Sequence, residues 1–232
     1  MSWIEDAKRN AVLKALEEVK SGWVIGLGSG STMAYAVKEL ARLQRDRKME
    51  FSVVPTSYQM EYLATSHGLR IASLNEVARV DYAIDGADQV RKGSLDLVKG
   101  GGGALLREKI VDSSAHNFVV VVDEYKMVDY LGGKQPIPLE ILPFAYRYVR
   151  SEVAKVGGRA KLRESAGKMG PVISDNGNFL VDADFGRVES PSKLERRLKA
   201  VAGVLETGLF VGMTDRVYVG QKNGKVHVVS PR

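Results

Sequence analysis

Two stretches of the sequence combine acids, a lysine and glycines at spacings that suit catalysis. In "DYAIDGADQV", Asp85 and Asp88 stand three residues apart at the end of an apolar segment. In "DLVKGGGGALLREK", Lys99 precedes four consecutive glycines, and Glu108 follows in a helix-like segment. Neighbouring carboxylates raise one another's pKa, can divide acid and base roles, and accept hydrogen bonds from sugar hydroxyls. A lysine beside bare backbone amides can stabilise a developing oxyanion.

Each of these stretches also has a structural interpretation. Aspartates in turns commonly cap the backbone, and the "REK" triplet around Glu108 is typical of surface ion pairs. A metal site at Asp85 and Asp88 would need a third ligand, and no suitable residue type is nearby. The glycine run favours a functional site because glycine costs chain entropy unless a positive φ or a close approach uses it.

A third stretch, "GLGSGST" at residues 26–32, lies between a strand-like and a helix-like segment. The amides and the dipole at the start of a helix attract anions there. A dinucleotide fingerprint would need glycine where Ser31 stands and an acid at the end of the next strand, where "PTS" stands instead. The hydroxyls of Ser29, Ser31 and Thr32 suit a small phosphate monoester better. A capped helix after a tight turn is the structural alternative.

Composition narrows the chemistry further. The 232 residues contain no cysteine and three isolated histidines, so we expect no disulfide, no thiol nucleophile and no metal site. No apolar run is long enough for a membrane helix, and the start lacks the layout of a signal peptide, so we expect a cytoplasmic protein that does not enter membranes.

The net charge of +6 suits binding of either nucleic acid or anionic metabolites. Without aromatic stacking motifs or a basic stripe, we expect no nucleic-acid binding.

The first part of the chain alternates strands and helices, which predicts a parallel sheet with helices on both faces and ligands at the carboxyl ends of its strands. The expected strands are 23–28, 51–57, 70–74, 80–88 and 117–125. The expected helices are 3–22, one from about residue 32, 58–68 and 104–115. The valine run of 117–125 is typical of a strand buried on both faces.

The remainder changes character after a proline-rich crossing that begins at Gly132. We expect a helix over 147–158, a hairpin over 171–186 in which Asn176 and Gly177 supply the positive-φ turn pair, and a helix over 190–204 capped by Ser190 or Ser192. The strands expected last return to the first sheet: 207–212, 216–221 and 225–230.

The predicted fold is therefore α/β, with a Rossmann-like, mostly parallel sheet and a smaller α+β domain of ferredoxin-like type. The predicted Rossmann-like catalytic domain comprises residues 1–131 with 208–232. The smaller domain comprises residues 132–207 and is expected to serve oligomerisation.

Taken in order, several motifs resemble ribose-5-phosphate isomerase of the A type. The resemblance runs along the whole chain through "GLGSGST", "DGADQV", "KGGGGALLREK", "DEYKMVDYLG", "PIPLEILPFA" and "SDNGNFLVD". It implies reversible isomerisation of D-ribose 5-phosphate to D-ribulose 5-phosphate in the non-oxidative pentose phosphate pathway, without metal or organic cofactor. It also implies a homodimer or homotetramer whose partner molecule is a sugar phosphate.

The resemblance also assigns roles to residues. It implies Glu108 as the general base acting through an enediolate, with Asp85, Asp88 and Lys99 as further catalytic residues. The implied substrate-binding residues are Lys8, Ser29, Gly30, Ser31, Thr32, Asp85, Gly86, Ala87, Asp88, Lys99, Gly100, Gly101, Gly102 and Lys126. Two positions depart from the family pattern: Ser29, where threonine is frequent, and Gln89, where glutamate is frequent.

Two other functions remain alternatives. A non-enzymatic sugar-phosphate sensor could share the fold and the stretch 26–32, which we call the phosphate loop after its expected ligand. Such a sensor needs a helix-turn-helix, however, for which the first 20 residues leave no room. A nicotinamide-dependent oxidoreductase is disfavoured by Ser31 and by the missing ribose-binding acid.

Overall fold

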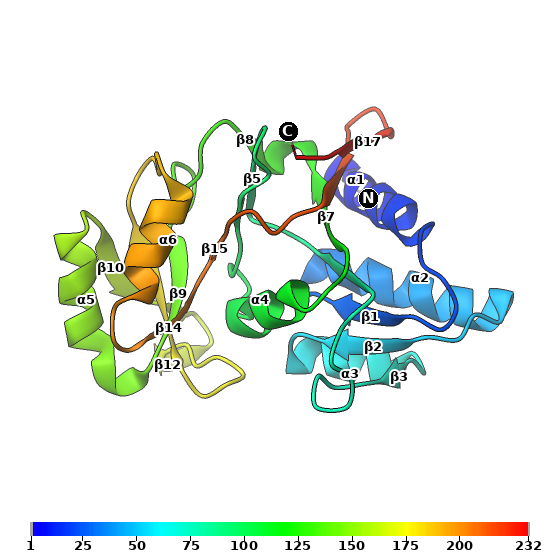
Figure 1. Ribbon diagram of the computed structural model, residues 1–232, viewed down its shortest axis with the longest axis horizontal. Helices are drawn as coiled ribbons and strands as arrows, with labels where there is room; N and C mark the ends of the chain where they lie inside the picture. Colours follow the sequence, from blue (N-terminus) through cyan, green and yellow to red (C-terminus); the bar gives the residue numbers. More distant parts are fainter. Residues whose placement is uncertain (1, 232) are drawn as a thin grey trace. The chain divides into compact units, whose positions relative to one another are not determined.

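The computed structural model describes residues 2–231 and divides into two compact units (Figure 1). The first unit comprises the chain up to Ala87, Arg107–Met127 and the chain from Met213 onwards. The second unit comprises Asp88–Leu106 and Val128–Gly212. The stretch with Asp88, Lys99 and the glycines thus belongs with the α+β part. The predicted domains, 1–131 with 208–232 and 132–207, are not tested by this division and stay a prediction.

A seven-stranded sheet forms the centre of the first unit and confirms the mostly parallel arrangement. Its order is β17-β16-β7-β4-β1-β2-β3, and only β17 is antiparallel to its neighbour. The strands are β1 (Val24–Leu27), β2 (Ser52–Pro55), β3 (Arg70–Ile71), β4 (Tyr82–Asp85), β7 (Phe118–Asp123), β16 (Arg216–Gly220) and β17 (Val226–Val229). The expected strand at 70–74 is therefore shorter than predicted, whereas the strands at 216–221 and 225–230 join this sheet as expected.

Helices cover both faces of this sheet. They are α1 (Trp3–Leu16), α2 (Ser31–Arg47), α3 (Tyr58–Ser66) and α4 (Leu105–Ser113), and a 3₁₀ turn, η1 (Glu124–Lys126), follows β7. Buried side chains of α1, α2 and α3 form one cluster with Ile25 and Leu27 of β1. Because side chains alternate along a strand, Gly26 faces the other side, where a Cβ would lie 2.7 Å from Val111 of α4. Strand β7 is buried along its whole length, as its valine run predicts.

The first helix ends at Leu16, earlier than the expected stop at Gly22. Beyond it, Glu18 accepts a hydrogen bond of 2.8 Å from Arg216 of β16 and another from Tyr218. These hydrogen bonds hold Glu18 against a strand that is distant in the sequence. The periodicity of 3–22 therefore could not predict that the helix ends before Glu18.

The second unit is built around a four-stranded antiparallel sheet of order β10-β13-β9-β14. Its elements are β9 (Ile137–Ile141), η2 (Pro143–Ala145), α5 (Tyr146–Lys155), β10 (Arg159–Leu162), β13 (Phe179–Asp184), α6 (Pro191–Lys199) and β14 (Val204–Thr207). The chain order β9-α5-β10-β13-α6-β14 is the βαββαβ pattern of ferredoxin-like folds, as predicted. Between β10 and β13 lies a small ladder of β11 (Glu164–Ser165) and β12 (Lys168–Pro171).

The hairpin turns at Asn176 and Gly177 as expected, but of the two residues only Gly177 has the predicted positive φ. Gly177 has a φ of 80°, and its amide donates to the Ser174 carbonyl at 2.9 Å. Ser190 stands at the N-cap of α6, as one of the two expected residues, but its side chain makes no capping hydrogen bond.

One expected strand belongs elsewhere. The segment 207–212 does not return to the large sheet, because β15 (Leu209–Phe210) pairs with β6 (Leu97–Val98). Together with β5 (Gln89–Arg91) and β8 (Met127–Val128), these strands form a sheet of order β15-β6-β5-β8. Gly208 makes this course feasible, because a Cβ there would lie 2.3 Å from the Lys99 carbonyl oxygen. The prediction for 207–212 was therefore wrong about its partner.

Candidate active site

The first unit presents its phosphate-loop candidates where β1 ends. The chain leaves Leu27, turns at Gly30 with a φ of 98°, and enters α2 at Ser31. Only glycine adopts that φ without strain. No side chain caps the start of α2. The first amides of the helix, together with Ser31 and Thr32, are therefore available to an anion.

Ser29 takes part in a hydroxyl cluster that sequence reasoning missed. Its Oγ lies 2.8 Å from Thr56 Oγ1 and donates to Ser57 Oγ at 2.7 Å. Thr56 and Ser57 are buried and follow β2, the neighbouring parallel strand. Ser57 also accepts from the Met60 amide and so caps α3. The signal was present in "PTSYQM", which reads as an N-cap after a strand.

Asp85 ends β4 and is fully buried against the phosphate loop. A Cβ at Gly28 would lie 1.9 Å from the Asp85 Cγ, so only glycine leaves room for this carboxylate. Asp85 Oδ1 accepts from the Gly86 amide at 2.6 Å. Gly86 and Ala87 lead the chain out of the first unit. Asp85 and Gly28 of the loop 26–32 therefore touch within the first unit.

Glu108 lies in the first turn of α4 and is 5 % exposed. The C-terminal end of α4 is fixed at the amino edge of the sheet, because the Ser114 carbonyl accepts from Val80, which precedes β4. A helix of nine residues is about 13 Å long, so its first turn points toward the opposite, carboxyl edge. Glu108 and Asp85 thus belong to the same edge of the large sheet.

Lys126 is the last residue of η1, directly after β7, and so lies at the carboxyl end of a third strand. The turn is stabilised by Asp123, whose side chain accepts from the Tyr125 amide at 3.0 Å. The ring of Tyr125 packs edge-on against Trp3 of α1, with centroids 5.0 Å apart.

Lys8 forms an ion pair within α1. Its Nζ lies 3.1 Å from Glu5 Oε1, and the hydroxyl of Tyr35 in α2 donates to Glu5 Oε2 at 2.6 Å. The hydrogen bond from Tyr35, followed by that from Lys8, lowers the pKa of Glu5 below its ordinary value. Tyr35 lies one turn after Ser31. This network therefore brings Lys8 beside the first turns of α2.

The second unit carries the other candidates on the short hairpin of β5 and β6. Gln89 pairs with Val98 in register, so Asp88 and Lys99 extend from neighbouring strand ends. Lys99 is 3 % exposed, and its Nζ lies 5.4 Å from the centre of the Phe210 ring. The Gln89 side chain accepts from the Gly132 amide at 2.9 Å. The side chain at this departure from the family pattern therefore makes a hydrogen bond within the second unit.

The glycine run 100–103 forms a turn beside Asp88. Gly100 and Gly103 have φ values of 97° and 84°, and the Gly103 amide donates to the Gly100 carbonyl at 3.0 Å. The Gly101 amide donates to Asp88 Oδ2 at 2.7 Å. A Cβ at Gly101 would lie 2.7 Å from Asp88 Oδ1, so a side chain there would displace the carboxylate. Gly102 has open space around it.

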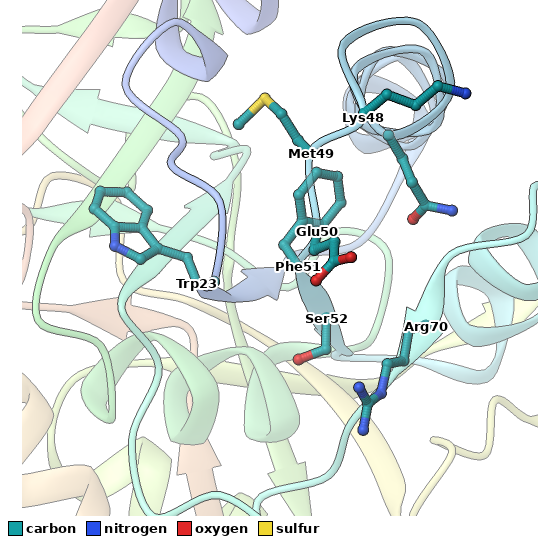
Figure 2. Close-up of a pocket in the computed structure, with 9 residues that line it drawn as sticks. Trp23, Lys48, Met49, Glu50, Phe51, Ser52 and Arg70 are labelled. Carbon is teal, nitrogen blue, oxygen red and sulfur yellow. The ribbon is translucent and has the colours of Figure 1, made fainter.

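A cavity of ≈ 610 Å³ lies elsewhere in the first unit, at the amino ends of β1, β2 and β3 (Figure 2). Its lining includes Trp23, Lys48, Phe51 and Arg70. None of the residues predicted to be functional lines it. Ligands of parallel sheets bind at the opposite, carboxyl edge, so this cavity is not the candidate active site.

Two kinds of site are absent from residues 2–231. They contain no group of three or more His, Cys, Asp or Glu side chains arranged to hold a metal ion. None of the helices described is long and apolar enough to span a membrane.

Comparisons with known proteins give one consistent result. Residues 52–224 match the family model described as ribose 5-phosphate isomerase A (phosphoriboisomerase A). A relative from Methanothermobacter thermautotrophicus named ribose-5-phosphate isomerase A is 46% identical over 217 residues, which cover 94% of this chain and 95% of the relative. A relative of the same name from Pyrococcus horikoshii is 44% identical and covers 95% of this chain and 96% of its own length.

A solved structure agrees with the sequence relatives. A D-ribose-5-phosphate isomerase in complex with phospho-erythronic acid superposes with a TM-score of 0.94 and 42% sequence identity. The match covers 98% of this chain and 99% of that structure.

Proposed function

Because this chain belongs to the ribose 5-phosphate isomerase A family, it is an aldose–ketose isomerase of ribose 5-phosphate, and we propose that Glu108 moves the proton between the two reacting carbons. Glu108 removes the C2 proton of the open-chain aldose, which gives an enediolate, and returns it to C1. The proton of the C2 hydroxyl ends on the C1 oxygen. A general base of this kind contributes about 10² to 10⁴ in rate.

The observation that carries this proposal is the position of Glu108. It is a nearly buried carboxylate in the first turn of α4, at the edge of the sheet where Asp85 and the phosphate loop also lie. A carboxylate with little access to water can exchange a proton with carbon without competition from solvent.

The enediolate oxygen needs a preorganised partner, and we assign this role to Lys99 with the neighbouring glycine amides. Loss of one such donor typically costs about 3 kcal/mol in the barrier. Lys99 belongs to the second unit, whereas Glu108 belongs to the first.

Asp85 and Asp88 are proposed to hold the sugar hydroxyls and to assist ring opening. The phosphate is proposed to bind at the start of α2, on the amides and hydroxyls of Ser29–Thr32, with Lys8 and Lys126 as cationic neighbours. Binding of this remote phosphate would fix the register of the sugar relative to Glu108. We further propose that the protein works in the cytoplasm as a homodimer or homotetramer that associates through the second unit.

The purified protein tests this function directly. A coupled assay should show conversion of ribose 5-phosphate to ribulose 5-phosphate, and the rate should persist after prolonged dialysis against EDTA. Absence of turnover, with binding of ribose 5-phosphate retained, would instead indicate a sensor. Loss of the rate on dialysis, restored by a divalent ion, would contradict the metal-free scheme.

A further inference from the structure

Arg163 links the ferredoxin-like sheet to the glycine turn. Its Nε and Nη2 donate to Asp182 Oδ2 and Oδ1 at 3.0 and 2.5 Å, which is a bidentate ion pair. Its Nη1 donates to the carbonyl oxygens of Gly100 and Gly101 at 2.8 and 3.1 Å. All of these residues belong to the second unit. The Arg163 guanidinium therefore joins the Asp182 carboxylate to two consecutive carbonyls of the glycine turn 100–103.

The peptide group between Gly100 and Gly101 transmits this contact to Asp88. In a trans peptide the carbonyl and the amide point in opposite directions. The carbonyl of this group accepts from Arg163, and its amide donates to Asp88 Oδ2 at 2.7 Å. A rotation of the peptide plane would break both hydrogen bonds together. The orientation of the Asp88 carboxylate is thereby coupled to the position of Arg163.

The sheet holds Arg163 rigidly. Arg163 follows β10, its amide donates to the Leu180 carbonyl at 2.9 Å, and its own carbonyl accepts from Val172 at 2.8 Å. The Arg163 side chain is 15% exposed, and that of Asp182 is 29% exposed. Leu180 of β13 lies under the turn as well, because a Cβ at Gly103 would lie 2.7 Å from its Cδ1. A rigid strand pair thus supports a turn whose glycines could adopt many conformations.

We propose that Arg163, oriented by Asp182, is a positioning residue for catalysis. It fixes the glycine turn so that the Asp88 carboxylate and the turn's backbone point toward the substrate. The role of the ferredoxin-like part is then not confined to association, because it organises part of the active site. The proposal rests on the proposed function for its catalytic consequence, but the anchoring of the turn can be measured without any substrate.

The test compares Arg163→Met with a matched control, Arg159→Met. Arg159 forms an ion pair of 2.8 Å with Asp184 across the same two strands, β10 and β13, but its side chain is 88% exposed. Hydrogen exchange followed by mass spectrometry would report on the segment 99–105. Steady-state kinetics with ribose 5-phosphate would report kcat and KM for each variant.

Arg163→Met should accelerate exchange in 99–105 and lower kcat about 10²-fold, because a misplacement of about 1 Å at a catalytic group has that effect. KM should change less than about threefold, because the phosphate is held by the first unit and ground-state binding is retained. Arg163→Lys should recover only part of kcat, since an ammonium cannot reproduce the planar fork. Arg159→Met should match the wild type in both measurements.

Several results would overturn the proposal. The first is an Arg163→Met variant with wild-type hydrogen exchange in 99–105 and wild-type kcat. The second is a loss of kcat that is equally large in Arg163→Met and Arg159→Met. If Arg163→Met does not fold, Asp182→Asn replaces it. Unchanged hydrogen exchange in 99–105 and unchanged kcat in that variant would likewise overturn the proposal. A wild-type protein without isomerase activity would refute the proposed function, whereas the exchange data would still decide whether Arg163 anchors the turn.

Discussion

At the scale of single residues, Glu108 carries the strongest prediction. Glu108→Gln keeps the shape of the side chain but removes its ability to accept a proton, so kcat should fall by about 10² to 10⁴. Binding of ribose 5-phosphate, measured by calorimetry, should remain detectable. Glu61→Gln, a change at an exposed acid of α3, is the control and should keep the wild-type rate. A Glu108→Gln variant as fast as the wild type would remove Glu108 from the mechanism.

Gly28 gives a second prediction, because it has no catalytic group of its own. In Gly28→Ala the new methyl group would occupy the space of the Asp85 carboxylate. Overpacking of this kind costs about 1–3 kcal/mol of stability. Displacement of Asp85 should also lower kcat/KM about 10²-fold. Thermal unfolding and steady-state kinetics would measure the two effects.

The control for Gly28→Ala is Gly167→Ala in the second unit. A Cβ at Gly167 meets nothing within 4 Å, and its φ is not in the left-handed region. This variant should match the wild type in kcat/KM. Full activity in Gly28→Ala would show that the site tolerates a shifted Asp85.

At the scale of elements, Ser57 joins helix α3 to the phosphate loop. Ser57→Ala removes the cap of α3, which costs about 1 kcal/mol. For a protein of this size that corresponds to about 2–4 °C in Tm. The lost hydrogen bond from Ser29 should in addition raise KM for ribose 5-phosphate.

Ser190→Ala is the matched control for Ser57→Ala. Ser190 stands at the N-cap of α6 without a capping hydrogen bond from its side chain, so its removal should change stability by less than about 0.5 kcal/mol. Equal effects of the two substitutions on Tm would contradict the assigned cap of α3.

The elements that the sequence predicted well are those with strong local patterns. The valine run became the fully buried strand β7, and Asn176 and Gly177 made the expected turn. The same holds for the structure of the loop 26–32, where a strand, glycines and a helix follow one another. These features depend on neighbours in the chain, and periodicity and turn chemistry therefore reveal them.

What the sequence did not reveal depends on partners that are distant in the chain. Leu209–Phe210 pairs with Leu97–Val98, more than a hundred residues earlier. Because an apolar strand could join any sheet, its own sequence does not identify this partner. Arg163 bonds to Gly100, 63 residues earlier in the chain, and nothing near it in the sequence distinguishes it from the exposed arginines. Hydroxyl partners such as Thr56 likewise need tertiary structure to be recognised.

At the scale of the whole molecule, the second unit exposes apolar side chains that suit the proposed association. Phe144 is 97% exposed, and Leu142 and Tyr148 near it in the chain are exposed as well. If this surface mediates the proposed oligomer, Phe144→Asp should shift the protein to a smaller species in analytical ultracentrifugation. Tyr62→Asp, at an exposed aromatic of the first unit, should leave the mass unchanged. An unchanged mass for Phe144→Asp would place the contact elsewhere.

The chain passes between the two units after Ala87, Leu106, Met127 and Gly212. No single cut, whether by a stop codon or by a protease, can therefore release either unit intact. A shortened gene that ends before Ile137 would lose β16 from the large sheet as well as Arg163. The proposed substrate-binding residues lie in both units, so we expect that neither unit alone would be an active enzyme.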